Sequence, residues 1–538
     1  MDILLLSLVA SGLALSIAGT MGRSDHEVSS GEDSPLGEDT QSQPNGENEA
    51  IIVLGSATGK FVPTDLFGAN IIFSANTNEG APTSNFESAV DATDMQSLRY
   101  PSGEGDGTAE TEGVDWINIT ALDENPNGLE LRKELTSVLD WARDPSGDGN
   151  TDDAITLTLV IPTLHISEDE LDRYAEDVQT FTQLVLESYP DVVNAFEIGN
   201  EYWRHTDEET YGKAANVAIK ALAAGMQDAG IDSYDGPDIF VQMGNTYNQS
   251  SFSTTLDDRG YFARLTDANK TIIAQLDDEA RSLIDGVVEH YYWKQDTTDF
   301  KNNESERMFI EHQYQFWDEL CEQDLSLNIT EWNVDMTNLE QNGMAAASLL
   351  IKLVENMTDM GVDSAFVWPL QHNTANDLAG GTDETADSND EDVLTNSVSG
   401  AIFDLMAQEL PGAELLDLVI ANEVTGLEIT AYQTDGATVI YVSSRSIDIL
   451  TFELDLRELV DADAIGTAVT IGIDQSTSDG YYYSAKEGRL QADYIFIDGT
   501  PYFYDEHDVA AKITYADLSG PEILLTLKPY EVVQLIFA

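Results

Sequence analysis

The stretch VNAFEIGNEYW, residues 193–203, decides the fold. Its apolar first half has the length of a buried strand, and polar residues follow it directly. Two helical patterns flank it, because residues 168–188 and 211–230 place apolar side chains at spacings of three and four. A strand between two amphipathic helices is the repeating unit of a parallel sheet that carries helices on its outside.

Seven further apolar runs continue this alternation along the chain. Together with residues 193–199 they are 67–74, 97–100, 155–163, 239–243, 287–292, 326–330 and 364–369. Eight strands that alternate with helices close a barrel, so we predict an α/β fold, a (β/α)8 or TIM barrel. Helical patterns at 344–360 and 395–410 complete it, and Pro411-Gly412 ends the last helix.

After residue 412 the pattern changes to alternating positions rich in β-branched and aromatic residues, as in 426–432, 437–443 and 450–456. We therefore predict a C-terminal antiparallel β-sandwich domain over 413–538 and the catalytic barrel over 51–412. The short run 50–54 precedes the first barrel strand. We expect it to dock on the sandwich, because an isolated strand needs a sheet partner.

The first 50 residues differ from the rest in composition. Residues 1–20 contain an apolar run of signal-peptide length, too short for a comfortable membrane span, which favours export even though Asp2 stands where such signals carry Lys or Arg. Residues 21–50 are rich in Ser, Gly, Asn and acidic side chains without apolar periodicity, which predicts a flexible acidic linker. We expect a secreted, extracellular protein without a membrane span.

The charge of the chain restricts its partners. It holds 99 Asp and Glu against 24 Lys and Arg, a formal net charge of −75. Such a charge repels nucleic acid and anionic membranes, which excludes both as partners, and it suits salty water, where self-repulsion is screened. The single cysteine, Cys321, excludes an intrachain disulfide, and we expect it to be a small buried side chain.

Two of the predicted strands end in a glutamate. Asn200-Glu201 follows the run at 193–199, and Glu331 follows the run at 326–330. Active sites of such barrels lie at the carboxyl ends of the strands, so both side chains are expected at one mouth. Cleavage of a glycosidic bond needs one carboxyl group that protonates the leaving oxygen and a second that attacks the anomeric carbon or activates water. The pair predicts a glycosidase.

With these features the chain resembles the clan A glycoside hydrolases, whose acid/base and nucleophile are glutamates at the ends of strands four and seven. The resemblance implies that Glu201 is the acid/base, that Glu331 is the nucleophile and that the anomeric configuration is retained. It also implies a contact of Asn200 with the sugar 2-hydroxyl. The appended sandwich is typical of members similar to families 39, 51 and 79.

The end of strand two adds to the resemblance. Its sequence LRYPSG, residues 98–103, is similar to the Leu-Arg-x-Pro-Gly-Gly motif of arabinofuranosidase-like and heparanase-like members, except at Ser102. The resemblance implies that Arg99 binds the nucleophile. The same roles require Glu201 to be protonated and Glu331 to be ionised near the working pH, and Arg99 would hold Glu331 charged.

Strands six and eight supply aromatic and imidazole side chains. The stretch EHYYW, residues 289–293, is similar to the clan's His-x-Tyr, and alternation places His290 and Tyr292 on one face. The resemblance implies that Tyr292 orients Glu331. It also implies that Trp368 forms the floor beneath the sugar ring.

Two basic residues, Arg204 and Lys294, stand just past the catalytic strand ends. Because basic residues are scarce in this chain, one interpretation is that the pair binds an anionic sugar, since a uronate or sulfate needs a Lys or Arg partner. The alternative is an ordinary ion pair with one of the many nearby carboxylates.

Three other polar residues near strand ends have two interpretations each. Glu197 either points into the site or forms a structural pair, and we favour the structural pair. His165 is either a substrate donor or a simple loop residue. Tyr291 alternates away from His290, so we expect it in the core rather than in the site.

The loop DPSGDGNTDD, residues 144–153, offers oxygen ligands at the odd spacings of an EF-hand-like calcium loop. These are Asp144, Ser146, Asp148, Asn150 and Asp152. Ile155 stands where the bidentate Glu belongs. A structural calcium site and an ordinary acidic turn are both open, and no cofactor is expected for catalysis.

We therefore expect an enzyme that hydrolyses O-glycosidic bonds of an oligo- or polysaccharide by double displacement. The alternative is a non-catalytic extracellular carbohydrate-binding protein on a glycosidase-like barrel. Arg99, Asn200, Glu201, Tyr292 and Glu331 together argue for the enzyme, because a binding protein has no need of all five.

Overall fold

The computed structural model describes residues 50–103, 130–294, 304–336, 341–380, 395–473 and 511–538, apart from 94, 152, 165, 233–235, 322–323, 373, 375 and 447, and four short strands between 481 and 503. The predicted export segment and nearly all of the predicted linker lie outside these residues. Within them, no helix has the length and apolar character needed to cross a membrane.

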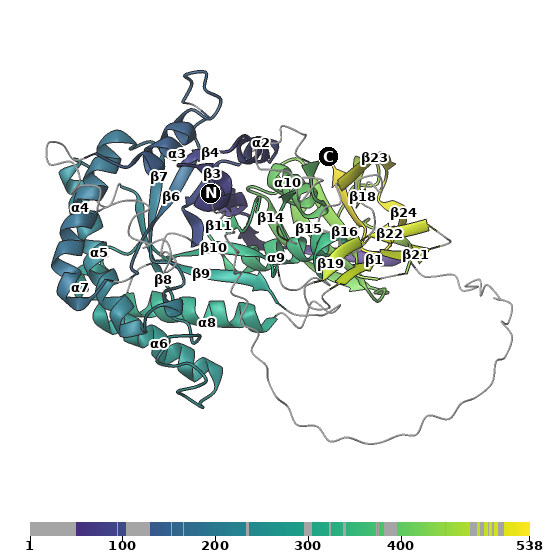
Figure 1. Ribbon diagram of the computed structural model, residues 1–538. Helices are drawn as coiled ribbons and strands as arrows, with labels where there is room; N and C mark the ends of the chain where they lie inside the picture. The colour runs from purple at the N-terminus through teal and green to yellow at the C-terminus, as the bar shows by residue number, and fades with distance from the viewer. Residues whose placement is uncertain are drawn as a thin grey trace. The chain divides into compact units, whose positions relative to one another are not determined.

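Within the described residues, eight parallel strands close into a barrel, as predicted (Figure 1). Their order around the barrel follows the chain, and the last strand pairs with the first, where Phe366 faces Gly68. All carboxyl ends therefore meet at one mouth. The strands are β2 (Gly68–Asn70), β5 (Ser97–Tyr100), β6 (Thr156–Ile161), β7 (Val193–Ile198), β8 (Asp238–Gln242), β9 (Gly286–Trp293), β10 (Ser326–Val334) and β11 (Ser364–Val367).

Helices cover the outside of the barrel, as Figure 1 shows for α4 to α8. The predicted helix 211–230 begins earlier, at Glu208, because Asp207 caps it by accepting a hydrogen bond from the backbone N–H of Thr210. The α-helices are α1 (Phe73–Asn76), α2 (Ser84–Ala92), α3 (Lys133–Arg143), α4 (Leu171–Ser188), α5 (Glu208–Asp228), α6 (Tyr261–Gln275), α7 (Asp278–Arg281), α8 (Glu304–Cys321), α9 (Ala346–Met360) and α10 (Val398–Glu409). Short 3-10 helices are η1 (Thr64–Phe67), η5 (Glu168–Glu170), η6 (Tyr202–Arg204) and η9 (Gly343–Ala345).

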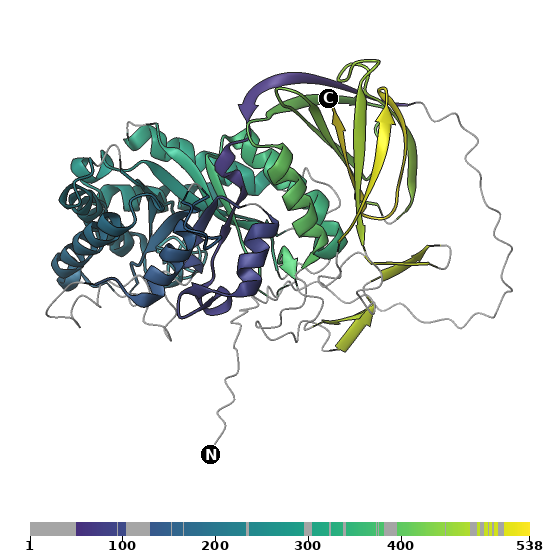
Figure 2. The same cartoon turned by 90° about the horizontal axis from the view of Figure 1, so that it is seen from above.

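The C-terminal domain is the predicted sandwich, a mainly antiparallel sheet of nine described strands around a core of its own. The leading strand β1 (Ile51–Phe61) runs antiparallel to β14 and parallel to β17, and Figure 2 shows it along this sheet. The other strands are β14 (Glu414–Ala421), β15 (Leu427–Gln433), β16 (Thr438–Ser444), β17 (Leu450–Asp455), β18 (Ile465–Ile473), β23 (Ala511–Ser519), β24 (Glu522–Leu527) and β25 (Val532–Phe537).

Four short hairpins complete the described elements. They are β3 (Thr77–Asn78) with β4 (Ala81–Pro82), β12 (Ala379–Gly380) with β13 (Thr395–Asn396), β19 (Tyr481–Ser484) with β20 (Arg489–Ala492), and β21 (Tyr494–Ile497) with β22 (Thr500–Phe503).

Helices α9 and α10 join the barrel to the sheet. Their buried side chains belong to one apolar core with Tyr432 and Tyr441 of the sheet. Polar contacts cross the same junction, because buried Arg445 donates to the carbonyl oxygen of Ala345 at 2.6 Å and Gln534 donates to that of Leu405 at 3.3 Å. The sheet therefore supports the side of the barrel that carries β10 and β11.

Gly400 of α10 tests how closely this helix packs on the segment before β12, because a Cβ added there would lie 2.1 Å from the carbonyl oxygen of Leu378. We expect Gly400→Ala to lower the free energy of unfolding by about 1–2 kcal/mol, because the clash costs up to about 3 kcal/mol and alanine favours a helix by about 1 kcal/mol over glycine. In the control Gly436→Ala, the added Cβ has no atom within 4 Å, and the change should stay within about 0.5 kcal/mol. Denaturant unfolding measures both. Equal stability of the two variants would contradict the close approach.

Candidate active site

Arg99, in β5, occupies the centre of the barrel mouth. Its side chain is fully buried, and each of its five N–H groups donates a hydrogen bond. Nε and Nη2 donate to the two oxygens of Glu197 at 2.5 and 2.9 Å, and Nη2 also donates to Oδ1 of Asn200 at 2.7 Å. Nη1 donates to Oδ1 of Asn70 at 2.9 Å and to Oε1 of Glu331 at 3.0 Å. The contact with Glu331 that the resemblance implies is therefore present.

Glu331 and Glu201 face each other across His290. Nδ1 of His290 lies 3.5 Å from Oε2 of Glu331 and 3.5 Å from Oε1 of Glu201, so these two oxygens are no farther apart than twice that distance. Oε2 of Glu331 also accepts a hydrogen bond from the hydroxyl of Tyr292 at 2.9 Å. Burial and Glu331 raise the pKa of Tyr292 well above its ordinary value, so this hydroxyl remains a donor.

A sharp turn at the end of β7 presents Glu201. Gly199 has a φ of 78°, and a Cβ there would lie 2.9 Å from Oγ1 of Thr163, so both the backbone and the space require glycine. Glu201 has a φ of 46°, a left-handed conformation that costs a non-glycine residue roughly 1 kcal/mol or more. Buried Tyr202 holds the turn, because its hydroxyl accepts a hydrogen bond from the backbone N–H of Asn245 at 3.1 Å.

A bulge in β10 brings Glu331 into the mouth. The pairing of β10 with β9 skips one residue, Thr330, immediately before Glu331. Consecutive side chains of a regular strand point to opposite faces. Here Oγ1 of Thr330 donates to Glu197 at 3.3 Å while Glu331 bonds to Arg99, so both neighbours reach the same polar centre.

Burial and the neighbouring charges have opposite effects on the pKa of Glu201. Burial raises the pKa of Glu201, but the contact with His290 at 3.5 Å and the charges of Arg204, His290 and Lys294 outweigh burial and lower this pKa to about 2. Burial lowers the pKa of His290, but Glu331 and Glu201 outweigh it and raise that pKa. In the substrate-free site the pKa of Glu201 is therefore low, because cations lie near its carboxylate. The protonated Glu201 that the acid role requires near the working pH stays a prediction.

The two predicted cations lie at this mouth. Arg204 is in η6, and its Nε forms an ion pair with Oε2 of Glu201 while 59% of its side chain remains exposed. Lys294 is exposed just after β9, and its charge acts on Glu201. The ion-pair interpretation therefore applies to Arg204, and its partner is the proposed acid/base itself.

The other side chains named from the resemblance lie at the same strand ends. Trp368 is half-buried, and its ring meets that of Tyr292 edge-on at a centroid distance of 6.4 Å. Trp203 meets the ring of His290 at 6.4 Å. Asn200 is buried and is fixed by the hydrogen bond that it accepts from the guanidinium of Arg99. Aromatic faces and polar groups thus share the mouth with the two glutamates, as a sugar site requires.

Three of the remaining expectations are met. Glu197 is completely buried and forms the structural pair with Arg99. Tyr291 is buried in the core, and its hydroxyl accepts a hydrogen bond from Nδ2 of Asn356 at 2.9 Å. Cys321 is buried. His165 lies outside the described residues.

The loop predicted to bind calcium forms hydrogen bonds within itself. The carboxylates of Asp144 and Asp148 accept backbone N–H bonds from the loop at 3.0 and 2.8 Å. Ser146 and Asn150 are exposed, and Asp152 lies outside the described residues. Among the residues that are described, no group of three or more His, Cys, Asp or Glu side chains could hold a metal ion. The calcium site stays a prediction.

Asn70 is a site residue that the sequence motifs do not reveal. It ends β2, and its Nδ2 donates to the carbonyl oxygens of Thr330 at 3.0 Å and of Phe366 and Val367 at 3.2 Å. Its Oδ1 accepts from Arg99. Its signal in the sequence is an amide inside an apolar run, at the end of the first barrel strand.

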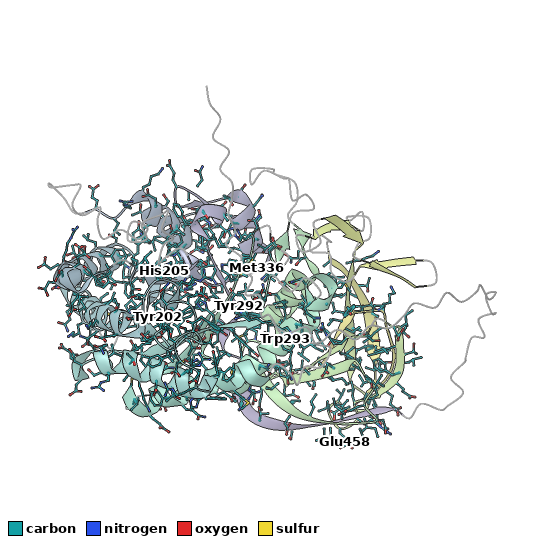
Figure 3. The ribbon with its side chains drawn as sticks, turned by 60° about the horizontal axis from the view of Figure 1, so that its bottom comes forward. Tyr202, His205, Tyr292, Trp293, Met336 and Glu458 are labelled. Carbon is teal, nitrogen blue, oxygen red and sulfur yellow. The ribbon has the colours of Figure 1, made fainter. Side chains whose placement is uncertain are left out.

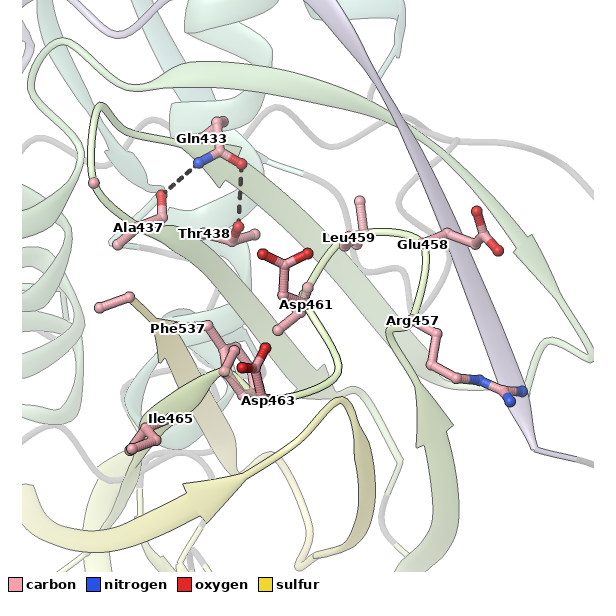
Figure 4. Close-up of a pocket in the computed structure, with 14 residues that line it drawn as sticks. Gln433, Ala437, Thr438, Arg457, Glu458, Leu459, Asp461, Asp463, Ile465 and Phe537 are labelled. Carbon is pink, nitrogen blue, oxygen red and sulfur yellow. Dashed lines mark hydrogen bonds between the residues drawn. The ribbon is translucent and has the colours of Figure 1, made fainter.

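A cavity of about 640 Å³ lies in the sandwich, lined in part by Asp461, Asp463 and Phe537 (Figure 4). In it Gln433, at the end of β15, donates a hydrogen bond to the carbonyl oxygen of Ala437 and accepts one from the hydroxyl of Thr438 on β16. No residue of the barrel mouth lines the cavity. Glu458, which does line it, is labelled in the sandwich in Figure 3, whereas Tyr292 is labelled in the barrel. The chemistry discussed here therefore belongs to the barrel.

No known family profile matches the sequence, and no curated protein matches it. Solved structures of low sequence identity do match its fold. A glycoside hydrolase family 51 arabinofuranosidase from Xanthomonas axonopodis pv. citri is 13% identical with a TM-score of 0.53, over 91% of this chain and 100% of that chain. A family 44 xyloglucanase from Paenibacillus polymyxa is 11% identical with a TM-score of 0.52, over 91% and 100%.

A 4-O-α-L-rhamnosyl-β-D-glucuronidase from Fusarium oxysporum 12S is 13% identical with a TM-score of 0.50, over 90% of this chain and 99% of that chain. In each case the match extends over both the barrel and the sandwich of this chain. The likeness is therefore one of fold, and the resemblance to clan A glycoside hydrolases in architecture is confirmed.

Proposed function

We propose that this protein hydrolyses O-glycosidic bonds of an extracellular oligo- or polysaccharide with retention of configuration, using Glu201 as acid/base and Glu331 as nucleophile. The observation that carries the proposal is the pair of largely buried carboxylates that share His290 at 3.5 Å each. The two oxygens that face His290 are therefore at most twice 3.5 Å apart, a range that includes the separation of about 5 Å typical of retaining glycosidases. The glycosidases of similar fold support the same reaction class.

The contacts of Glu331 suit a nucleophile. In the first step one oxygen of Glu331 attacks the anomeric carbon, and the bond to the leaving oxygen breaks. The leaving oxygen keeps the electron pair and takes a proton from Glu201. Arg99 and Tyr292 hold the two oxygens of Glu331, which fixes the direction of the attack.

In the second step a water molecule gives a proton to Glu201 and attacks the anomeric carbon, which releases Glu331 as a carboxylate. Glu201 thus acts first as an acid and then as a base. The second role matches its ionised state in the free site. The first role requires that bound substrate weaken the influence of at least one surrounding cation.

Two substitutions separate the roles, after a screen of aryl pentosides, hexosides and uronides has identified a substrate. Glu331→Gln should lower kcat by at least about 10⁴-fold on every glycoside, because it removes the nucleophile. Glu201→Gln should lower kcat/KM, which reports the first step alone, by about 10²- to 10⁴-fold on a phenyl glycoside and far less on a nitrophenyl glycoside, whose leaving group departs without a proton.

Exposed Glu453 in β17 supplies the control, and Glu453→Gln should keep wild-type activity. Proton NMR of the first-formed product reports its anomer, which should equal that of the substrate. An inverted product would overturn the assignment of Glu331 as nucleophile. A wild-type protein without turnover on any glycoside would favour the carbohydrate-binding alternative.

The charge of Glu201 also has a thermodynamic signature. Its pKa of about 2 in the folded protein lies below the ordinary 4.5, so ionised Glu201 stabilises the fold above pH 4.5 and this contribution is lost as the pH falls towards 2. The stability advantage of wild type over Glu201→Gln should shrink by roughly 2 kcal/mol between about pH 6 and pH 3. Urea unfolding at both pH values measures it, and a constant difference would show that Glu201 has an ordinary pKa.

A further inference from the structure

The two carboxylate oxygens of Glu201 have different neighbours. Oε1 lies 3.5 Å from His290, which also touches Glu331, so Oε1 faces the nucleophile. Oε2 is held by Nε of Arg204. Arg204 therefore binds the oxygen of Glu201 that His290 does not hold, and we take this as the leaving-group side of the bond to be cleaved.

This contact conflicts with acid catalysis. A guanidinium keeps its charge at every working pH and donates hydrogen bonds without giving up a proton, so it stabilises the carboxylate form of Glu201. The groups that act on Glu201 are His290 from β9, Lys294 just after β9 and Arg204 from its own turn. His290 is part of the buried centre, whereas Arg204 and Lys294 are exposed. Of these two, Arg204 forms the ion pair with the carboxylate, so it is the group that a substrate anion can draw away.

We propose that Arg204 binds a carboxylate on the leaving-group sugar of the substrate, a hexuronate, and that this exchange of partners releases Glu201 to take up a proton. The inference rests on the proposed function. Arg204 already binds the carboxylate of Glu201 in the free site, so a substrate carboxylate would replace it with a group of the same chemistry. The exposed side chain can form two parallel hydrogen bonds with the substrate carboxylate, a geometry that favours the exchange.

The charge of the molecule supports this choice of ligand. Only 24 Lys and Arg residues stand against 99 acidic ones, yet Arg204 and Lys294 both act on Glu201. A neutral sugar has no need of two cations at this position. An anionic one requires them, because its charge is otherwise repelled by the acidic surface.

A matched pair of disaccharides tests the exchange. Both carry the glycone that the aryl screen identifies, and the leaving-group sugar is a hexuronate in one and its neutral hexuronamide in the other. We expect wild type to cleave the uronate with a kcat/KM about 10- to 100-fold above that of the uronamide. Arg204→Gln should bring this ratio close to one, and it should raise kcat on the uronamide because Glu201 is no longer held as a carboxylate.

The pH profile supplies a readout that a merely structural role would not move. On the uronamide, Arg204→Gln should shift the basic limb of kcat/KM to higher pH, because protonated Glu201 then persists further. Arg173→Gln is the control, since Arg173 is 61% exposed and pairs with Asp177 on α4, outside the site. It should leave the ratio and the profile unchanged.

Each outcome decides the proposal. Equal cleavage of uronate and uronamide by wild type, or an equal loss on both in Arg204→Gln, would overturn the role of Arg204 and leave the glycosidase intact. Absence of wild-type turnover on aryl glycosides and disaccharides alike would overturn the proposed function and this inference together.

Discussion

The barrel mouth depends on the buried guanidinium of Arg99. A buried charge costs several kcal/mol unless partners replace its lost hydration. Arg99, in β5, meets this condition with Glu197 and Asn200 from the end of β7, Glu331 from β10 and Asn70 from β2, so four strand ends meet at its side chain. Because one side chain ties these ends together, the position of the nucleophile cannot change without breaking the polar centre of the barrel.

The electrostatic balance of the site differs from that of the whole protein. Three carboxylates, Glu197, Glu201 and Glu331, lie among Arg99, His290 and further cations, within a chain whose net charge is −75. Long-range repulsion between such a surface and an anionic polymer falls off within about 8 Å at physiological salt and about 3 Å at 1 M. The local cations therefore act at contact distance while salt screens the remainder of the surface.

The sequence predicted the barrel, the sandwich and most side chains at the strand ends, because apolar periodicity and position along a strand carry that information. It did not predict the bulge at Thr330, because an extra residue in one strand is visible only beside its neighbour. The contacts of Asn70 with three backbone carbonyls and the pairing of Arg204 with Glu201 depend in the same way on the assembled structure. The lowered pKa of Glu201 in the substrate-free site follows from those contacts and was not visible in the sequence for that reason.

The leading strand β1 has a consequence for how the domains can be separated. It lies between β14 and β17, so the barrel is inserted, in topological terms, between the first and second strands of the sandwich. The chain crosses between the domains twice, once after Phe61 and once before Glu414. Two covalent connections restrict rotation of one domain against the other more than a single linker would. No single cut in the chain yields a complete sandwich.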